Sequence, residues 1–482
     1  MVNVSPRSIV SVLALLLGPL IYIGHEKISI DIPSGVAPVP GPVHRLQEYL
    51  RIRTDHPNPA YEEAQTFLNE TVRSLLPNVS VSVHTYVEGK SVLVITLPGT
   101  QPHLASLLLN SHTDVVPSEE AKWQWPPYSA KTVFRDGELR IYARGSQDMK
   151  SVGLQYLEAL AELAQKNWIP KRTIHVSFVP DEEIGGRDGM GKFVESPEFD
   201  ALNVGVALDE GLPRDDGKFN VYYGERRTWW LAVKVNDNPG HGATLPDRTA
   251  SNTLNKIIAN ALAFREKQVK RLKQGVDPGY IIGVNLAYLK AGHPDEEMAS
   301  GFVMNVIPSV SEAGFDIRVP PTVHNTDVEQ EIESWFMCDE KEKCPGVSYD
   351  WVMKVETDVM TSRDPSENTF ITPFMNGMKN SGIEDQLSHG IFPAATDSRY
   401  IRKKGIPCFG FSPINRSPDL LHKHNEYLPV DTYMRGIRIY ENLIQELGDH
   451  QSVSVKVEDE NGNGVLSSTP VHESESEEKQ DL

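Results

Sequence analysis

Cysteine is scarce in this chain, whose 482 residues include only three, at positions 338, 344 and 408. So few thiols exclude a fold that is held together by a framework of disulfides. In an oxidising compartment Cys338 and Cys344 can still pair around a short loop, which would leave Cys408 free.

Positive charge is also in short supply. Lys and Arg number 47 against 66 Asp and Glu, so the net charge is −19, which argues against nucleic acid as a partner. Part of the excess lies in residues 452–482, where eight acids face two lysines and large apolar residues are few. That composition predicts an acidic, disordered tail over residues 451–482.

A hydrophobic run of membrane-spanning length is missing as well. Residues 9–24 are almost entirely apolar, but a spanning helix needs roughly 20 residues and Pro19 interrupts this run. With Arg7 before it, the run fits the core of a secretory signal. We therefore predict a signal peptide or signal anchor over residues 1–27 and a Pro/Gly linker over residues 28–42.

This N-terminal segment sets the predicted location. It indicates the secretory pathway, with a protein that is secreted or membrane-anchored and a catalytic domain on the lumenal or extracellular side. Contact with a membrane would then be made only by the N-terminal anchor. A cytoplasmic location and a buried N-terminal helix are the alternatives.

The folded part of the chain shows no internal repeat and alternates between strand and helix patterns. Apolar runs at 104–109, 173–179 and 204–208 predict buried strands. After Tyr223 the order becomes strand, helix, two strands and helix, which is typical of an inserted α+β domain. We predict an α/β catalytic domain whose two parts, 43–224 and 341–450, flank an inserted domain at 225–340.

Acids and histidines gather where these predicted strands end. Open α/β sheets place their sites outside the carboxyl ends of the strands, and consecutive acids repel one another unless a cation lies among them. Nitrogen and carboxylate ligands suit zinc or another divalent transition metal, and their number favours two metals bridged by a carboxylate. Taken singly, each residue is better explained by a structural role than by a functional one. The set is His112, Asp114, Asp148, Asp181, Glu182, Glu183, Asp209, Glu210, His422 and His424.

Several segments together resemble one family. The aminoacylase-1 family of N-acyl-amino-acid amidohydrolases belongs to the co-catalytic dizinc metallopeptidases, with carboxypeptidase G, succinyl-diaminopimelate desuccinylase and carnosinase. The resemblance covers roughly residues 43–447. The segments that carry it are HTDVVP, ARGSQDMKSVG, VPDEEIGG, ALDEG, PGHG, NVIP, FDIR, ATDSRYIRKKGIP and FSPINRSPDLLHKHNE.

The resemblance implies a zinc-peptidase-like α/β/α catalytic domain with a ferredoxin-like inserted domain that serves as lid and dimerisation domain. A homodimer through that domain is implied too. The resemblance further implies two Zn²⁺ ions per subunit. His112 and Asp209 would bind one ion, Glu183 and His422 the other, and Asp148 would bridge them. His424 is expected to support the loop rather than bind metal.

The resemblance also assigns the catalytic groups. Glu182 is the expected general base, which takes a proton from the metal-activated water and delivers it to the departing amine. Asp114 would accept the proton of the second imidazole nitrogen of His112. His241 would reach across the dimer from the partner subunit and stabilise the oxyanion.

Substrate contacts follow from the same motifs. Asn305 would contact the carbonyl region, and Arg318 is the candidate for the substrate's α-carboxylate because Arg can grip it bidentately. Thr396 is expected to hydrogen-bond near the lid. Arg399 is a further candidate for substrate binding, and for Arg399 and Arg402 ion pairing within the fold is an equal alternative.

The implied activity is zinc-dependent hydrolysis of N-acyl-L-amino acids to a carboxylate and a free L-amino acid. A dipeptidase or carboxypeptidase on the same scaffold, or a reversible fatty-acyl amino acid synthase/hydrolase, is the alternative. A peptidase would need an acid near the acyl pocket, whereas an acyl chain needs apolar lining. A non-catalytic binding protein is disfavoured, because no key position of the motifs is lost.

Overall fold

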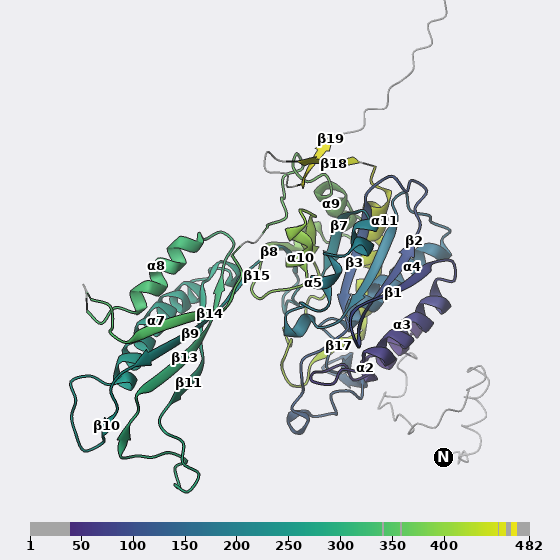
Figure 1. Cartoon of the computed structure of the whole chain (residues 1–482). Helices are drawn as coiled ribbons and strands as arrows, with labels where there is room; N and C mark the ends of the chain where they lie inside the picture. Colours follow the sequence, from purple (N-terminus) through teal and green to yellow (C-terminus); the bar gives the residue numbers. More distant parts are fainter. Residues whose placement is uncertain (1–38, 340–341, 357–358, 452, 459–463, 470–482) are drawn as a thin grey trace, which may run out of the picture.

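The computed structural model describes residues 39–339, 342–356, 359–451, 453–458 and 464–469. The predicted signal segment and nearly all of the linker lie outside these residues. The described residues form a larger α/β body and a smaller body that projects from it (Figure 1). No helix within these ranges combines the length and the apolar character needed to cross a membrane.

The larger body is built on an eight-stranded sheet with the order β1-β2-β6-β3-β7-β16-β8-β15. Strands β3, β6, β7 and β16 are parallel, so their carboxyl ends meet at one edge of the sheet. The three apolar runs expected to be strands form β6, β3 and β7, which are fully buried because both faces of the sheet are covered. The strands are β1 (Ser80–Val87), β2 (Lys90–Leu97), β3 (Ser106–His112), β6 (Ile174–Val179), β7 (Val204–Asp209), β8 (Phe219–Glu225), β15 (Leu387–Phe392) and β16 (Cys408–Gly410).

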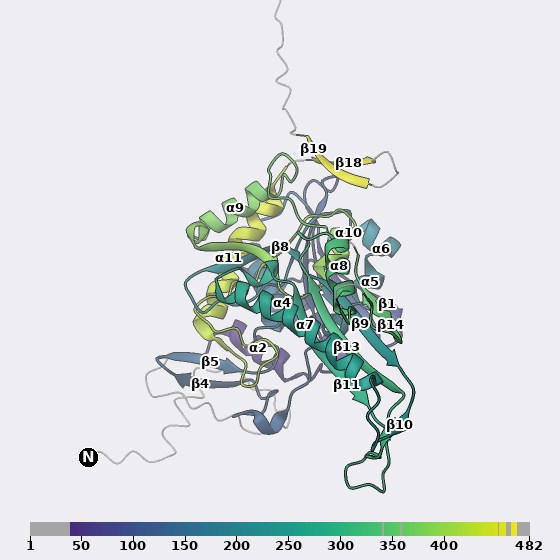
Figure 2. The same ribbon diagram turned by 90° about the vertical axis from the view of Figure 1, so that its left-hand side faces the viewer.

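Helices cover both faces of this sheet, as Figures 1 and 2 show. The apolar stripes of the longer helices pack with β3 and β6 into one core, and the short helices close a second core on the opposite face. The α/β prediction is thereby confirmed. The first set is α2 (Gly41–Arg51), α3 (Tyr61–Leu75), α4 (Lys150–Gln165), α9 (Ile371–Asn380) and α11 (Val430–Asp449); the second is α5 (Met190–Phe193), α6 (Pro197–Ala201) and α10 (Ser398–Lys403).

Smaller elements complete the larger body. A three-stranded sheet, β17-β5-β4, joins β4 (Lys131–Arg135) and β5 (Glu138–Tyr142) to β17 (Tyr427–Pro429), so the loop before β17 lies beside the segment that follows β5. Short 3₁₀ turns are η1 (Glu120–Lys122), η2 (Glu182–Ile184), η3 (Pro278–Tyr280) and η4 (Glu384–Gln386).

The smaller body, which we call the lid, contains a four-stranded antiparallel sheet with the order β11-β13-β9-β14. Its chain order, β-α-β-β-α-β, is the ferredoxin-like arrangement. Alternating residues of β9, among them Trp229, Leu231 and Val233, face the two helices, which leaves the other face of the sheet open. The elements are β9 (Arg227–Asn236), α7 (Ala250–Lys273), β11 (Gly283–Ala291), β13 (Val310–Val319), α8 (Asn325–Trp335) and β14 (Val347–Lys354).

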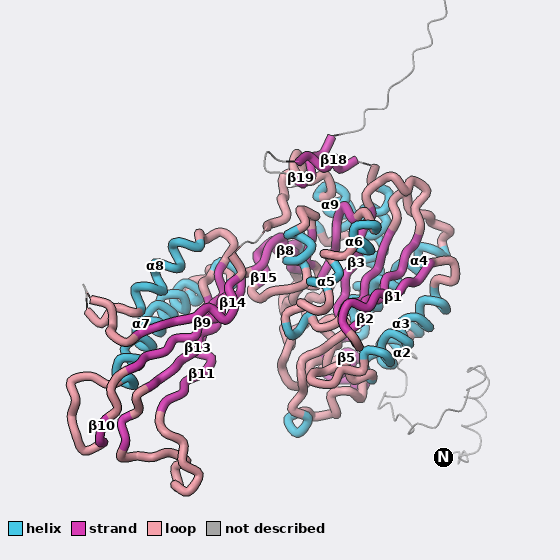
Figure 3. The backbone as a smooth tube through the Cα atoms, in the orientation of Figure 1, coloured by secondary structure: helices cyan, strands magenta, loops and turns pink. Residues whose placement is uncertain are grey.

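The tip of the lid carries a two-stranded ribbon of β10 (Gly240–His241) and β12 (Val306–Ile307). The sequence pattern predicts a longer strand over residues 301–306, but only Val306 of this range belongs to β12, and Phe302 forms an isolated bridge with Pro294. Figure 3 shows that the rest of this tip is loop.

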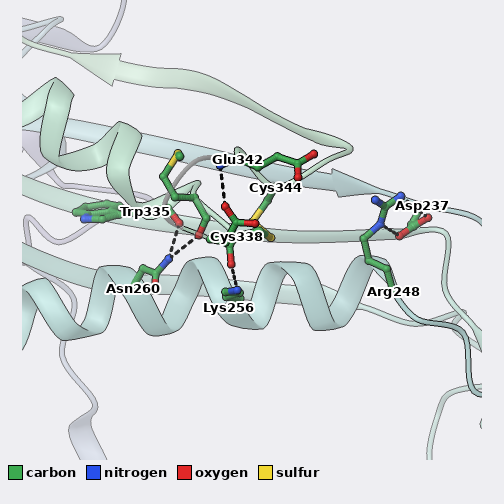
Figure 4. Close-up of a disulfide and its surroundings, with 10 residues drawn as sticks. Asp237, Arg248, Lys256, Asn260, Trp335, Cys338, Glu342 and Cys344 are labelled. Atoms are coloured by element: carbon green, nitrogen blue, oxygen red, sulfur yellow. Dashed lines mark hydrogen bonds and ion pairs between the residues drawn. A yellow bond between two sulfur atoms is a disulfide. The ribbon is translucent and has the colours of Figure 1, made fainter.

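A disulfide joins Cys338 to Cys344 just after α8, and Cys408 is free and buried. Figure 4 shows that helix α7 holds the same turn from below. Asn260 donates a hydrogen bond to the carbonyl oxygen of Trp335 at 3.0 Å, and Lys256 donates to the carbonyl oxygen of Cys338. The end of α8 is thus fixed covalently to the strand that follows it and by hydrogen bonds to α7.

The prediction of disorder from residue 451 onward is wrong for part of the tail. Strands β18 (Val453–Glu458) and β19 (Gly464–Thr469) pair in antiparallel fashion. The valines at 453, 455 and 457 alternate with polar residues, which is the period of a strand, and the acidic composition hid this signal. Residues 470–482 lie outside the described residues.

Candidate metal centre

Two overlapping groups of potential ligands lie where β3, β6 and β7 end. Ligand atoms of His112, Glu182 and Glu210 lie within 4.8 Å of one another, and so do those of His112, Asp148 and Glu183. Apart from Glu183, which is partly exposed, these residues are buried. Four acids around one histidine leave an excess of negative charge that a divalent cation would neutralise.

Asp148 lies between two histidines that are far apart in the sequence. Its Oδ1 is 3.1 Å from Nε2 of His112, and its Oδ2 is 3.2 Å from Nε2 of His422. On a tetrahedral zinc ion two ligand atoms are separated by roughly 3.3 Å, because each Zn–N or Zn–O bond is about 2.0 Å. Each oxygen of Asp148 is therefore placed to share a cation with one histidine.

Glu183 completes the side of the centre that contains His422. Its Oε2 lies 3.1 Å from Nε2 of His422, whereas its buried Oε1 has no hydrogen-bond partner among the described residues. A buried carboxylate oxygen without a donor is costly unless a cation lies beside it. The donor set of imidazole and carboxylate without thiolate fits zinc.

The electrostatics of the cluster agree with a cation site. Burial and the charge of Asp148 raise the pKa of Glu183 to about 7. Burial also raises the pKa of Glu182 and of Glu210 well above the usual range, with further contributions from the neighbouring acids. Hydrogen bonds to Asp148 and Glu183 raise the pKa of His422 to about 10. The raised pKa values show that these carboxyl and imidazole groups attract protons, and a bound metal would displace those protons.

The turn after β6 brings Glu182 and Glu183 to the same side. Asp181 and Gly185, on either side of η2, have φ values of 66° and 105°, so the chain reverses in the left-handed region instead of continuing the alternation of a strand. Asp114 fixes this turn, because its carboxylate accepts hydrogen bonds from the backbone N–H groups of Glu182 and Glu183, both at 3.1 Å.

The role expected of Asp114 is therefore corrected. Nδ1 of His112 lies 2.9 Å from the backbone oxygen of Asp114 but 3.7 Å from its carboxylate. The backbone carbonyl orients the imidazole, while the carboxylate orients the glutamates and contacts Nε2 of His56 at 3.2 Å.

Asp181 stabilises the same turn through contacts with residues outside the cluster. Its carboxylate accepts a hydrogen bond from the Tyr61 hydroxyl at 2.7 Å and forms an ion pair with Lys90 at 2.5 Å. The three consecutive acids of the motif thus have different surroundings, since only Glu182 and Glu183 face the cluster.

Glu426 is a structural residue of the centre that the sequence did not reveal. Its fully buried carboxylate accepts hydrogen bonds from Arg144 at 2.7 Å and from the backbone N–H of Gln147 at 2.7 Å. These contacts tie the loop that carries His422 to the segment that carries Asp148. His424, by contrast, lies 3.8 Å from Glu119, so the structure places it outside the ligand groups.

The expected ligand Asp209 is also corrected. Its carboxylate accepts hydrogen bonds from Asn110 at 3.1 Å and from Ser398 at 2.7 Å, so both of its oxygens already have partners outside the cluster. The next residue, Glu210, lies 4.0 Å from Nε2 of His112 and belongs to a ligand group. Asp209 is the last residue of β7, and its side chain contacts Asn110 of β3 and Ser398 of α10 instead of the ligand groups.

A cavity of about 1070 Å³ opens from the metal centre towards the lid. It is lined by Asp148, Glu182, Glu183, Glu210 and His422 on one side and by open-face lid residues such as Thr228, Trp230 and Arg318 on the other. Apolar lining residues include Ile184, Leu212, Met353, Val355, Val359, Phe392 and Leu421. The cavity thus combines a polar centre with a largely apolar wall.

Two of the expected substrate contacts are engaged within the fold. Thr396 is buried and does not line the cavity, and its hydroxyl donates a hydrogen bond to Glu225 at 2.8 Å. Arg399 does line the cavity, but its guanidinium donates to the carbonyl oxygens of Gly185 and Thr396, both at 2.7 Å. Arg402 is buried and pairs with Glu225 at 3.0 Å, the structural alternative considered for it.

His241 belongs to β10, which lies at the tip of the lid, away from the larger body that contains the metal centre (Figure 1). The backbone N–H of Gly242 donates to the carbonyl oxygen of Asn305 at 2.7 Å, which joins the two loops. Neither His241 nor Asn305 lines the cavity. Within one chain the structure therefore brings together four of the five expected metal ligands, all except Asp209, but not the expected oxyanion group.

Curated relatives match most of the chain. Aminoacylase-1 of Mus musculus is 44% identical over 404 residues, which are 83% of this chain and 94% of the relative. Aminoacylase-1 of Dictyostelium discoideum is 42% identical over 408 residues, 83% of this chain and 96% of the relative.

These relatives correct the predicted location. They are enzymes of the cytosolic aminoacylase-1 type, so the secretory prediction is wrong, the signal peptide is not supported, and the cytoplasmic alternative is the better supported. The misleading signal was the apolar run at 9–24, which is short and contains Pro19.

Solved structures share the fold. An M20 family metallo-carboxypeptidase from Sulfolobus solfataricus superposes with a TM-score of 0.64 at 18% identity over 85% of this chain and 99% of its own. A dinuclear metal-binding M20 peptidase from Bacillus subtilis gives 0.55 at 14% identity over 84% of this chain and 98% of its own. The sequence model described as "Peptidase family M20/M25/M40" matches residues 108–446. With the relatives described above, this match shows that the chain belongs to the peptidase family M20/M25/M40 and, within it, to the aminoacylase-1 group of metal-dependent amidohydrolases.

Proposed function

We propose that the chain hydrolyses N-acyl-L-amino acids to a carboxylate and a free L-amino acid with two zinc ions in its metal centre. One observation carries this proposal. Asp148 faces His112 with one oxygen and His422 with the other, and Glu182 and Glu183 stand beside this bridge. This is the arrangement that a two-metal hydrolase needs for ligands and a general base.

The ligands divide into two sets around Asp148. His112 and Glu210 would hold one ion, and Glu183 and His422 the other. When bound, the metal ions would lower the pKa of a coordinated water and polarise the amide carbonyl. Glu426 holds the loop that carries His422 against the segment that carries Asp148.

Glu182 is the proposed general base. It is 8% exposed and belongs to the group that contains His112 and Glu210. Burial raises its pKa well above the usual range, which increases its affinity for a proton. Glu182 accepts a proton from the attacking water and later gives it to the amide nitrogen as the C–N bond breaks.

Arg318 is the proposed partner of the substrate's α-carboxylate. Its Nε and Nη2 donate to Asp316 at 2.8 and 3.1 Å, and its Nη1 donates to Thr228 at 2.8 Å. One N–H therefore remains on each terminal nitrogen, which leaves two donors for a carboxylate. The ion pair with Asp316 keeps the guanidinium in this orientation at the edge of the cavity.

A homodimer through the lid is the proposed state of assembly, because His241 lies too far from its own metal centre to act there. Strand β11 is an edge of the lid sheet and is mostly exposed. Large exposed apolar side chains surround the tip, and such a surface is typical of an interface. They are Leu245, Tyr288, Leu289, Met298, Phe302, Met304 and Val306.

Mixing two inactive variants tests the dimer. Glu182→Gln and His241→Ala are each expected to be inactive, but a mixed dimer contains one site with both Glu182 and a partner's His241. Co-expression of the two chains should therefore recover about a quarter of the wild-type activity, because half of the dimers are mixed and each has one intact site. The measurement is turnover of the co-expressed pool and of doubly tagged, purified mixed dimers, which should have about half of the wild-type activity because one of their two sites is intact. Full activity of His241→Ala alone, or no recovery in confirmed mixed dimers, contradicts the proposal.

A substrate panel with and without chelator tests the activity itself. We expect hydrolysis of N-acetyl-methionine, loss of that activity when a chelator removes the metal, and recovery when zinc is returned. Metal analysis should give two zinc ions per chain. The panel also contains long-chain N-acyl-glutamine and a dipeptide. Hydrolysis of the dipeptide alone would replace the aminoacylase proposal with the peptidase alternative.

A further inference from the structure

Five basic side chains line the cavity, and three of them are engaged within the fold. Arg318 is held by Asp316 and Thr228, and Arg399 donates to two carbonyl oxygens of the larger body. Lys354 pairs with Glu329 and lies 3.4 Å from Glu356. The lining bases are Arg187, Arg318, Lys354, Arg399 and Lys403.

The other two, Arg187 and Lys403, are exposed and make no hydrogen bond or ion pair with any residue that the structure describes. The acids close to Arg187 and Lys403 in the sequence and on α6 pair with other basic side chains. Asp188 pairs with Lys90 at 2.6 Å, and Asp200 lies 3.9 Å from Lys404. Two like charges therefore stand at the cavity without an ion-pair partner among the described residues.

Both bases belong to the same wall of the cavity. The Tyr400 hydroxyl donates to the carbonyl oxygen of Gly185 at 2.7 Å, and a Cβ added to Gly186 would lie 3.1 Å from the Tyr400 ring. Arg187 directly follows this contact, and Lys403 lies one turn beyond Tyr400 on α10. The contact between the turn and α10 thus places the two cations in the same cavity as Glu182 and Glu183.

We propose that Arg187 and Lys403 form a subsite for a second carboxylate of the substrate. This subsite rests on the proposed function. It predicts a preferred class of substrates, namely N-acyl amino acids that carry an acidic group besides the α-carboxylate. Arg318 already accounts for the α-carboxylate, and Arg can hold a further carboxylate by charge-assisted hydrogen bonds. Two local cations also offset the repulsion that a chain of net charge −19 exerts on a dianionic substrate.

The test compares kcat/KM for three substrates on the zinc-loaded enzyme. N-acetyl-methionine has no second acid, N-acetyl-glutamate carries it on the amino acid, and N-succinyl-methionine carries it on the acyl group. In the double variant Arg187→Gln/Lys403→Gln the ratio of acidic to neutral kcat/KM should fall roughly 10-fold, mainly through KM, because two charge-assisted contacts are lost. Which acidic substrate loses more identifies the half of the substrate that the subsite binds.

Lys192→Gln is the matched control, because Lys192 is exposed on α5, shortly after the same turn, but does not line the cavity. It should leave the ratio unchanged. The wild-type preference for the acidic substrate should also weaken as salt is added. An unchanged ratio in the double variant, or wild-type hydrolysis of N-acetyl-methionine alone, overturns the subsite. Absence of hydrolysis for all substrates overturns the proposed function instead, and the subsite with it.

Discussion

Glu182→Gln is expected to lower kcat for N-acetyl-methionine by roughly 10²–10⁴-fold, the contribution typical of a general base. Gln has the same size but cannot take a proton from water or deliver one to the leaving amine. KM should change little, because Arg318 and the cavity wall remain intact. Steady-state kinetics on protein loaded with zinc measure both quantities.

Two measurements separate this effect from misfolding. The variant should retain two zinc ions, and its metal-free melting temperature at neutral pH should be no lower than that of the wild type. The raised pKa of Glu182 lowers the stability of the wild type above the ordinary pKa of a glutamate, and Gln does not carry this cost. Glu198→Gln, which removes an exposed glutamate of α6, is the control for charge alone. Full activity of Glu182→Gln would exclude Glu182 as the base.

Glu210→Gln should leave one zinc ion per chain in place of two and reduce kcat by more than about 100-fold, beyond the 10–100-fold typical of residues that support ligands. The reason is that Glu210, rather than Asp209, shares a ligand group with His112. Metal analysis after dialysis against limiting zinc gives the stoichiometry.

Asp209→Asn is the comparison that decides between the two neighbours. Asn can still bond to Asn110 or Ser398, so this variant should bind two zinc ions even if its stability is reduced. The opposite pattern, with metal lost from Asp209→Asn and kept by Glu210→Gln, would restore Asp209 as the ligand.

Much of the fold could be predicted from the sequence, because its strongest signals are local. Continuous apolar runs mark β3, β6 and β7, and these strands bring the acids to one edge of the sheet. Strand β14 was missed although residues 347–351 alternate between apolar and polar side chains, because this short, partly exposed edge strand follows the predicted end of the inserted domain at residue 340. The hairpin at 453–469 was missed because composition was given more weight than alternation.

The site was predictable in its residue types but not in its finest geometry. Asp209 and Glu210 are adjacent acids, and only the end point of β7 decides which of them faces the metal centre. The exclusion of Thr396 depends on Glu225, a residue far away in the sequence. Arg187 and Lys403 stand out only by elimination, once the partners of the other bases are known.

The position of β16 has a consequence for how the protein is made. This short strand lies between β7 and β8 in the sheet, yet it follows the whole lid in the chain. A ribosome adding 5–20 residues per second therefore needs on the order of ten seconds or more after β8 before the gap can close. His422 emerges later still. The nascent larger body must wait with an open sheet and an incomplete set of metal ligands, while the lid can fold on its own elements in the meantime.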